Sequence, residues 1–447
     1  MIDRRRPEGA SGSAPEIVTL AEATRVWARV GLESFGGPAA QIAVMHRVVV
    51  EERRWLSEER FLHALNYCML LPGPEAQQLA IYAGWLLHGF RGGLIAGWLF
   101  VLPGALVMLL LSAVYAVYQD VTVIAGLFFG LRAAVLAVVF EAVVRIGRRV
   151  LGRRHAIWIS AGAFTAIFFL GLPFPVVVLG AALAGSVLWS ATAGPARLEE
   201  VPSDRRDVGL GRAFRVGATW GGLWLLPVGA LTVLAGPSSV WSQLSRFFSL
   251  AAVLTFGGAY AVLSFVAQRA VEVYGWLEPG EMLAGLGMAE TTPGPLILVL
   301  EFVGFQAAYR DPGTMSPVLA GTLGALLVIW VTFAPCFLWI FLGAPYAERL
   351  RGVRALDAAL TGVTAGVVGV ILNLAVWLTI HTLFLAVDDR YRAGIRLLVP
   401  DLATFQPAAL VIALAASIAV FRWHAGTLKV LGAAVVAGIV VRLGGLG

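Results

Sequence analysis

The stretch "LLPGPEAQQLA", residues 70–80, interrupts a strongly apolar part of the chain. Pro72, Gly73 and Pro74 break a helix there, because proline has no backbone donor and its ring clashes with the preceding turn. In lipid, backbone groups that lose their helical partners must be satisfied inside the protein or by water in a cavity. The stretch therefore predicts a discontinuous helix whose break is buried in protein or lines a wet cavity.

The composition around this break is that of a polytopic membrane protein. The chain has 447 residues, of which 59% are hydrophobic and 13% charged, whereas a soluble protein has about 25% charged residues. Runs of about 20 apolar residues, enough to cross a bilayer, recur along the chain. We expect an all-α protein with about thirteen transmembrane segments, at residues 17–50, 61–89, 92–118, 121–145, 155–171, 173–192, 214–236, 243–270, 282–309, 317–342, 356–387, 404–422 and 426–445.

Basic residues predict the orientation of these segments. The loops after even-numbered segments hold most of the arginines, while the loops near Asp120 and Pro173 hold none. The positive-inside rule then places the N-terminus in the cytoplasm and the C-terminus outside it. The formal charge of +6 is explained by these loops, so we expect no nucleic-acid partner. Cys68 and Cys336 are too few for a disulfide framework, and we expect no metal site and no cofactor.

The break is repeated in the second half of the chain. "SFGGPAAQ" at Ser34 returns as "TFGGAYAV" at Thr255, and "LLPGPE" returns as "TTPGPL", each 221 residues later. Without gaps, residues 35–74 match residues 256–295 at thirteen of forty positions. The sequence therefore predicts a tandem duplication, with a first repeat in 1–200, a linker and linking helix in 201–240 and a second repeat in 241–447. Seven segments separate equivalent points, so the two repeats should have inverted topology, as in many transporters.

A half-helix that begins inside the membrane directs unpaired N–H groups and a positive dipole end into the site, which suits an anion. The glycine pairs allow close backbone approach and positive φ, so consecutive amides can form a concavity for an anion. Packing between helices is the alternative role for each glycine. The substrate-binding candidates are Gly36, Gly37, Pro38, Gln41, Pro72, Gly73, Pro74, Gln77 and Gln78 in the first half, and Gly257, Gly258, Thr291, Thr292, Pro293, Gly294 and Pro295 in the second.

Ionisable residues within the apolar segments are also candidates, because each is costly in lipid. Arg132 has no carboxylate near it in sequence and is a candidate for binding the substrate or for gating, whereas the spacing of Glu141 and Arg145 predicts a structural ion pair. Glu75, Glu290 and Glu301 lie at or near the breaks and are candidates for coupling transport to protons.

"FGGPAAQIAVMH", "LLPGPEAQQLAIYAGWLLHGFRGGLIAGWLFVLPG" and "LTFGGAY…TTPGPLILVLEFVGFQA" resemble the chromate transporter family, in its long two-domain form. The resemblance is strong over about residues 30–118 and 250–340. It implies secondary active efflux of chromate across the bacterial inner membrane, and hence chromate resistance. It maps the family motifs onto Phe35, Gly36, Gly37, Pro38, Gln41, Pro72, Gly73, Pro74, Gln77, Gln78, Gly257, Gly258, Pro293, Gly294 and Pro295.

Two alternatives stay open. Sulfate is a tetrahedral dianion of similar size, so a sulfate or other oxyanion carrier or exchanger fits the same residues, and so does a passive anion channel with a static selectivity region. An enzyme is not expected, since the chain has no GxxxxGK[ST] phosphate loop and no HExxH motif. The expected partners are chromate or sulfate, protons as a coupling ion, membrane lipid and a second copy in a homodimer.

Overall fold

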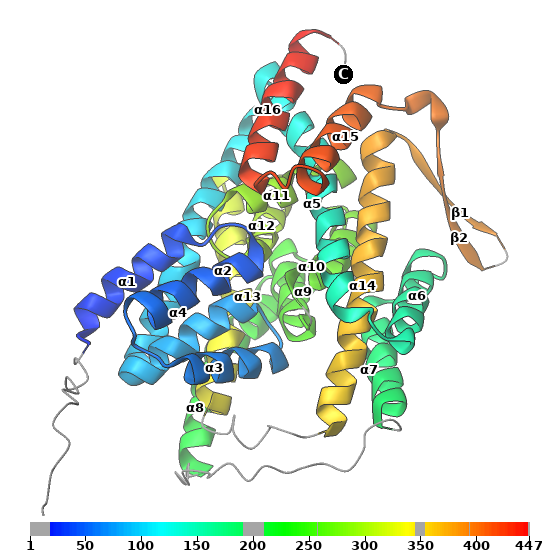
Figure 1. The fold of residues 1–447 in the computed structure, drawn as a ribbon. Helices are drawn as coiled ribbons and strands as arrows, with labels where there is room; N and C mark the ends of the chain where they lie inside the picture. The colour runs from blue at the N-terminus through cyan, green and yellow to red at the C-terminus, as the bar shows by residue number, and fades with distance from the viewer. Residues whose placement is uncertain (1–17, 191–209, 257, 345–353, 393, 446–447) are drawn as a thin grey trace, which may run out of the picture.

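The computed structural model describes residues 18–190, 210–256, 258–344, 354–392 and 394–445, and Figure 1 shows that helices dominate it. The predicted all-α membrane fold is confirmed at this level. Gly257 and the predicted linker at 191–209 lie outside the described residues.

The helices of the first half are α1 (Leu20–Glu33), α2 (Gly37–His46), the π-helix η1 (Arg47–Glu52), α3 (Glu58–Leu70), α4 (Glu75–Tyr118), α5 (Thr122–Val150), α6 (Arg154–Phe168) and α7 (Phe174–Ser190). Then follow α8 (Leu210–Leu234), α9 (Val240–Leu254), α10 (Ala259–Gln268), the π-helix η2 (Arg269–Val273), α11 (Pro279–Thr291), the short η3 (Leu296–Leu298) and α12 (Val299–Arg310). The chain ends with α13 (Pro317–Gly343), α14 (Arg354–Leu383), strands β1 (Val387–Arg392) and β2 (Ile395–Pro400), η5 (Leu402–Thr404), α15 (Pro407–Phe421) and α16 (Thr427–Leu443).

Among the described residues, five helices are long and apolar enough to cross a membrane, namely α4, α5, α8, α13 and α14. The segments Phe174–Leu188 and Pro407–Phe421 are apolar but shorter. The count of thirteen segments and the inverted arrangement of the halves stay predictions.

Helix α4 is two helices joined by a sharp turn. His88 and Gly89 leave the helical conformation, and Gly89 has a φ of 60°. The two arms then pack against each other so closely that a Cβ on Gly84 would overlap the Gly92 carbonyl. The turn coincides with the predicted boundary between segments 61–89 and 92–118.

The predicted segments at 17–50 and 243–270 are each broken, which the sequence did not lead us to expect. The chain leaves the helix after Glu33 and again after Leu254. The positive φ values of 85° at Gly36 and 102° at Gly258 explain why glycine stands at both breaks. Each half thus contains two breaks, one at Phe-Gly-Gly and one at Pro-Gly-Pro.

Backbone hydrogen bonds around these breaks repeat at the same spacing of 221 residues. The Trp55 N–H donates to the Val49 carbonyl, and the Trp276 N–H donates to the Ala270 carbonyl, both at 2.8 Å. The π-helices η1 and η2 also begin and end at nearly equivalent places. The duplicated sequence therefore adopts a duplicated local backbone.

The last three helices of each half exchange partners with those of the other half. Helix α5 packs on α15 and α16, and α14 packs on α6 and α7. Helices α5 and α14 contact each other and also cover α10 and α11 of the second half. The buried core therefore lies around the breaks of the second half.

A small hairpin departs from the all-α prediction. Strands β1 and β2 pair antiparallel, from Val387 opposite Pro400 to Arg392 opposite Ile395. Figure 1 shows this hairpin as an arm that reaches from the end of α14 toward α6. The predicted helical segment 356–387 ends a few residues earlier, at Leu383.

Candidate functional site

The two halves are joined at their breaks by a reciprocal pair of backbone hydrogen bonds. The Gly73 N–H donates to the Thr255 carbonyl at 2.8 Å, and the Gly294 N–H donates to the Ser34 carbonyl at 2.7 Å. Equivalent residues of the two bonds are 221 apart. We call these contacts the Thr255 joint and the Ser34 joint. In each joint a Pro-Gly-Pro break of one half meets the Phe-Gly-Gly break of the other.

A kinked helix closes each joint from the side. A Cβ on Gly104 in α4 would overlap the Pro293 carbonyl, and a Cβ on Gly73 would lie 3.0 Å from the Cys336 sulfur in α13. Gly104 directly follows Pro103, and Cys336 directly follows Pro335, so corresponding prolines kink both helices. The sequence analysis missed both contacts, although "LPG" and "APC" stand at matching places after the breaks.

Four helical segments begin at the joints. Helix α2 begins at Gly37 with Pro38 in its first turn, α10 at Ala259, α4 at Glu75 after Pro74, and η3 at Leu296 after Pro295. Helix N-termini carry partial positive charge, and anions are stabilised there. The N–H groups of Gly73 and Gly294 are not free for an anion, because they bond to the carbonyls of the joints.

Three glutamines line the joints and differ in their partners. The Gln41 amide donates to the Gly294 carbonyl at 2.6 Å, and the Gln78 amide donates to the Pro72 carbonyl at 2.7 Å. Gln77 is fully buried, yet neither its Nε2 nor its Oε1 has a hydrogen-bond partner. A buried polar group without a partner is costly, so the Gln77 amide is the clearest position for a ligand or water.

The predicted coupling carboxylates lie in three different surroundings. Glu75 begins α4 at the Thr255 joint, where its Oε1 lies 3.9 Å from the position of a Cβ on Gly258. Glu290 accepts a hydrogen bond from the Tyr260 hydroxyl at 2.5 Å. Glu301 is buried among apolar side chains, and neither of its oxygens has a hydrogen-bond partner. Only Glu75 lies at a joint.

Thr291 and Thr292 are turned away from the role that we predicted for them. Both hydroxyls donate to the Met288 carbonyl at 2.8 Å, inside their own helix α11. A hydroxyl bonded in this way stabilises the end of the helix, although its oxygen can still accept.

Arg132 lies apart from the joints, in a cavity of about 370 Å³ between α5, α11 and the helices of the C-terminal end. Its Nη2 donates to the Tyr115 hydroxyl at 2.7 Å, and its buried Nε has no partner. Arg442 lines the same cavity, and so do Glu278 and Glu281, of which Glu281 is paired with Arg310. The cavity therefore has mixed charge and is an entrance to the joints rather than part of them.

The ion pair predicted between Glu141 and Arg145 is confirmed, at 3.4 Å. It lies at the end of α5 opposite Arg132 and has a structural role.

Apolar helices that cross a membrane, together with buried broken helices, define a polytopic membrane transporter. The sequence profile of the family described as "Chromate transporter" matches residues 21–186 and 242–440. The chain belongs to the chromate transporter family. This is a family of membrane transporters and not of enzymes, and its members support transport of chromate at the level of the family.

Similar proteins cover most of the chain. It is 34% identical over 355 residues to the chromate transport protein of Pseudomonas aeruginosa, covering 77% of each chain. It is 27% identical over 422 residues to the probable chromate transport protein of Synechococcus elongatus, covering 91% of this chain and 96% of the other. A chromate transport protein of Cupriavidus metallidurans is 29% identical over 365 residues, covering 81% of this chain and 83% of the other. No solved structure matches the chain.

Proposed function

We propose that this protein exports chromate from the bacterial cytoplasm across the inner membrane by secondary active transport, and so confers resistance. The observation that carries the proposal is the pair of joints, where four helical segments begin beside the buried, unpartnered amide of Gln77. Positive dipole ends and neutral amide donors suit a tetrahedral dianion, which needs donors on several sides.

The proposal includes an inverted topology in which the broken segments re-enter the membrane without crossing it. The Arg310 guanidinium at the end of α12 pairs with Glu281 and donates to the Trp276 carbonyl, both near the start of α11. The α11–α12 unit therefore returns to the end of the molecule where it began. If all four broken units do the same, nine crossings remain, with the N-terminus in the cytoplasm and the C-terminus outside it.

The joints support a carrier over a channel. Backbone atoms meet directly at both joints, and glycine is required for the contact at Gly73 and at Gly104. Substrate can reach the Gln77 amide only if the two halves move relative to each other. Such a movement is the alternating access of inverted-repeat carriers.

Glu75 is the carboxylate that we assign to coupling. It lies at the first turn of α4, where a negative charge competes with the anion for the same dipole end. Protonation of Glu75 would admit the dianion, and its ionisation would expel it. Glu75→Gln should therefore bind chromate but lose the dependence of transport on a proton gradient.

The test is uptake of radiolabelled chromate into inside-out vesicles that contain the purified protein, with and without a proton gradient and with sulfate as competitor. Saturable, gradient-dependent uptake is expected. Sulfate uptake without chromate uptake would replace the substrate and keep the site. A flux that stays linear with concentration would replace the carrier by a channel.

Tags on the two termini test the topology separately. They should be accessible from opposite sides of the membrane. Two cytoplasmic tags would contradict the inverted arrangement.

A further inference from the structure

The β1–β2 arm holds a buried ionic contact that joins two parts of the molecule. Arg396 on β2 is paired through Nη2 with Glu272 of η2 at 2.7 Å, and its Nε donates to Asp389 of β1 at 2.8 Å. Its backbone N–H donates to the Phe169 carbonyl at the end of α6, also at 2.7 Å. Only 8% of the Arg396 side chain is exposed. One residue therefore connects the arm, the α6–α7 turn and the segment that follows α10.

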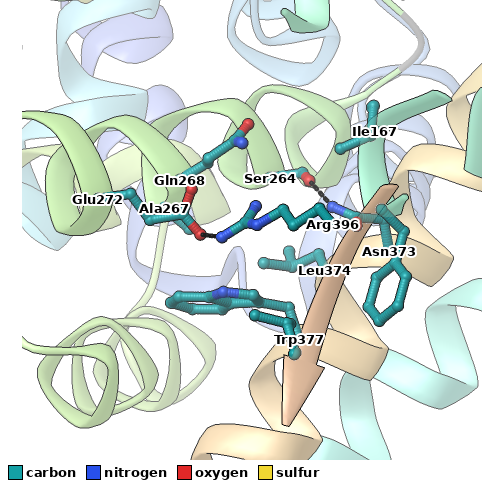
Figure 2. Close-up of a pocket in the computed structure, with 11 residues that line it drawn as sticks. Ile167, Ser264, Ala267, Gln268, Glu272, Asn373, Leu374, Trp377 and Arg396 are labelled. Atoms are coloured by element: carbon teal, nitrogen blue, oxygen red, sulfur yellow. Dashed lines mark hydrogen bonds and ion pairs between the residues drawn. The ribbon is translucent and has the colours of Figure 1, made fainter. Parts of the chain in front are cut away.

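Figure 2 shows what lies beneath this contact. Arg396 covers a void of about 10 Å³, with Trp377 and Leu374 of α14 on one side and Ser264 and Gln268 of α10 on the other. The Asn373 amide of α14 donates to the Ser264 hydroxyl at 3.5 Å. The ion pair thus closes the end of the seam between α10 and α14, and the void has room for about one water.

Burial lowers the pKa of Arg396, but the hydrogen bonds and charges of Asp389 and Glu272 outweigh it and raise that pKa above its usual range. The guanidinium is therefore charged whenever the contact is formed. Opening the seam leaves the charges without partners unless water reaches them, so the contact and access of water to the seam are linked.

The equivalent glutamate of the first half has no such contact. Glu51 lies 221 residues before Glu272 and within the equivalent π-helix, but its carboxylate is exposed and pairs only locally with His46, at 3.2 Å. The link that follows α5 corresponds in order to the arm that follows α14, and it is basic, with Arg148, Arg149, Arg153 and Arg154. All four arginines are exposed, and no ion pair joins them to Glu51 or Glu52 among the residues that the structure describes.

We propose that Arg396 and Glu272 form an ionic latch that closes the seam at the arm end of the transporter, and that Glu51 and the arginines after α5 form the corresponding latch at the opposite end when the first one opens. This inference rests on the alternating access proposed above. Arg396 acts on access to the site and does not touch the substrate. The structure is the state closed at the arm end, where α10 is covered by α14, and open at the other end, where α2 is exposed.

The first test measures access to the seam, without any transported anion. Ser264→Cys places a small thiol at the closed seam, in a background in which the buried Cys68 and Cys336 are replaced by alanine. A membrane-impermeant thiol reagent is added from the arm side. Arg396→Gln and Glu272→Gln should each raise the labelling rate at least about ten-fold, because either change leaves one member of a buried pair without its partner. Arg396→Lys keeps the charge and should give an intermediate rate.

The matched control is Arg390→Gln. Arg390 lies on the same hairpin and pairs with Asp388, but both side chains are 66% exposed. It should leave the labelling rate at that of the parent protein. Equal labelling in the parent, Arg396→Gln and Glu272→Gln would overturn the latch.

The second test measures the opposite end. Cysteines at Glu51 and Arg153 should form a disulfide faster when Arg396→Gln is also present, since opening one end brings the other together. An unchanged rate would overturn the exchange between the two ends. Chromate uptake is measured on the same variants. Absent uptake in the parent protein together with a responsive seam would refute the proposed substrate and leave the latch intact.

Discussion

Equivalent segments on either side of the duplication have opposite surroundings. Every residue from Ala259 to Ala267 in α10 is buried, whereas in α2 only Gln41 and Met45 are. Helices α5 and α14 both pack against the second half, and the first half is left uncovered. Two copies of one local structure therefore occupy two environments at once. In a symmetric transporter this difference describes a state, because moving the covering helices to the first half would produce its counterpart.

The largest expected effect comes from filling the joints. Gly73→Val or Gly294→Val should reduce chromate transport about 100-fold or more. Both glycines have positive φ, 125° and 91°, where a β-branched residue costs of order 1–3 kcal/mol, and Gly73 also lacks room for a Cβ. Transport is measured in vesicles at matched protein abundance.

The control for the joints is Gly229→Val, since a Cβ on Gly229 in α8 meets nothing within 4 Å. Normal transport by either joint variant would show that the joints are not the site. Loss in only one would show that the two halves do not contribute equally.

The next effect contrasts equivalent positions in the covered and uncovered helices. Ser264→Trp in α10 should destabilise the protein by about 1–3 kcal/mol, because its site is filled by α14. Ala43→Trp, 221 residues earlier on the exposed face of α2, should leave stability within about 0.5 kcal/mol. Thermal unfolding in detergent measures both.

Transport by Ala43→Trp then tests whether the exposed face has to be covered during the cycle. We expect a folded protein that does not transport, because the indole would block closure over α2. Full activity would mean that α2 stays exposed, and that the difference between the halves is permanent.

A smaller effect is expected at the unpartnered amide. Gln77→Leu should weaken chromate binding about 10- to 100-fold, since a hydrogen bond to a charged group contributes roughly 1.5–3 kcal/mol. Stability should not fall, because the amide has no partner to lose. Binding is measured by isothermal titration.

Gln306→Leu is the matched control for this prediction. The Gln306 amide is also buried but donates to the Ser112 carbonyl at 3.2 Å. It should lose stability and keep its affinity. The reverse pattern would move the anion away from Gln77.

The smallest effect is expected at Arg132. Arg132→Gln should slow transport about 10-fold at low ionic strength and less at high salt, because a cationic cavity attracts anions over a distance that salt screens. Arg145→Gln at the other end of the same helix serves as the control. A rate that is unchanged at every salt concentration would make Arg132 structural.

Much of this organisation could be predicted from the sequence. The spacing of 221 residues located both Pro-Gly-Pro breaks, because a break depends on local chemistry: proline cannot donate, and glycine adopts positive φ. Apolar runs long enough for a bilayer located the crossing helices α4, α5, α8, α13 and α14. The motifs around Gly36 and Gly73 indicated the family, which the profile match confirms.

The joints could not be read from the sequence. Gly73 bonds to Thr255 and Gly294 to Ser34 across the duplication, and a repeat shows which residues are equivalent but not which are in contact. The latch between Glu272 and Arg396 joins residues 124 apart, through a β-hairpin that the apolar pattern did not predict.

The sequence by itself determined the class of protein, the duplication and the places where helices break, because bilayer thickness and backbone sterics act on each segment alone. Only the tertiary structure decided which breaks meet, which amide is left without a partner and which half is covered. Those choices depend on close packing between segments far apart in the chain, and two copies of the same sequence pattern can be packed in two different ways.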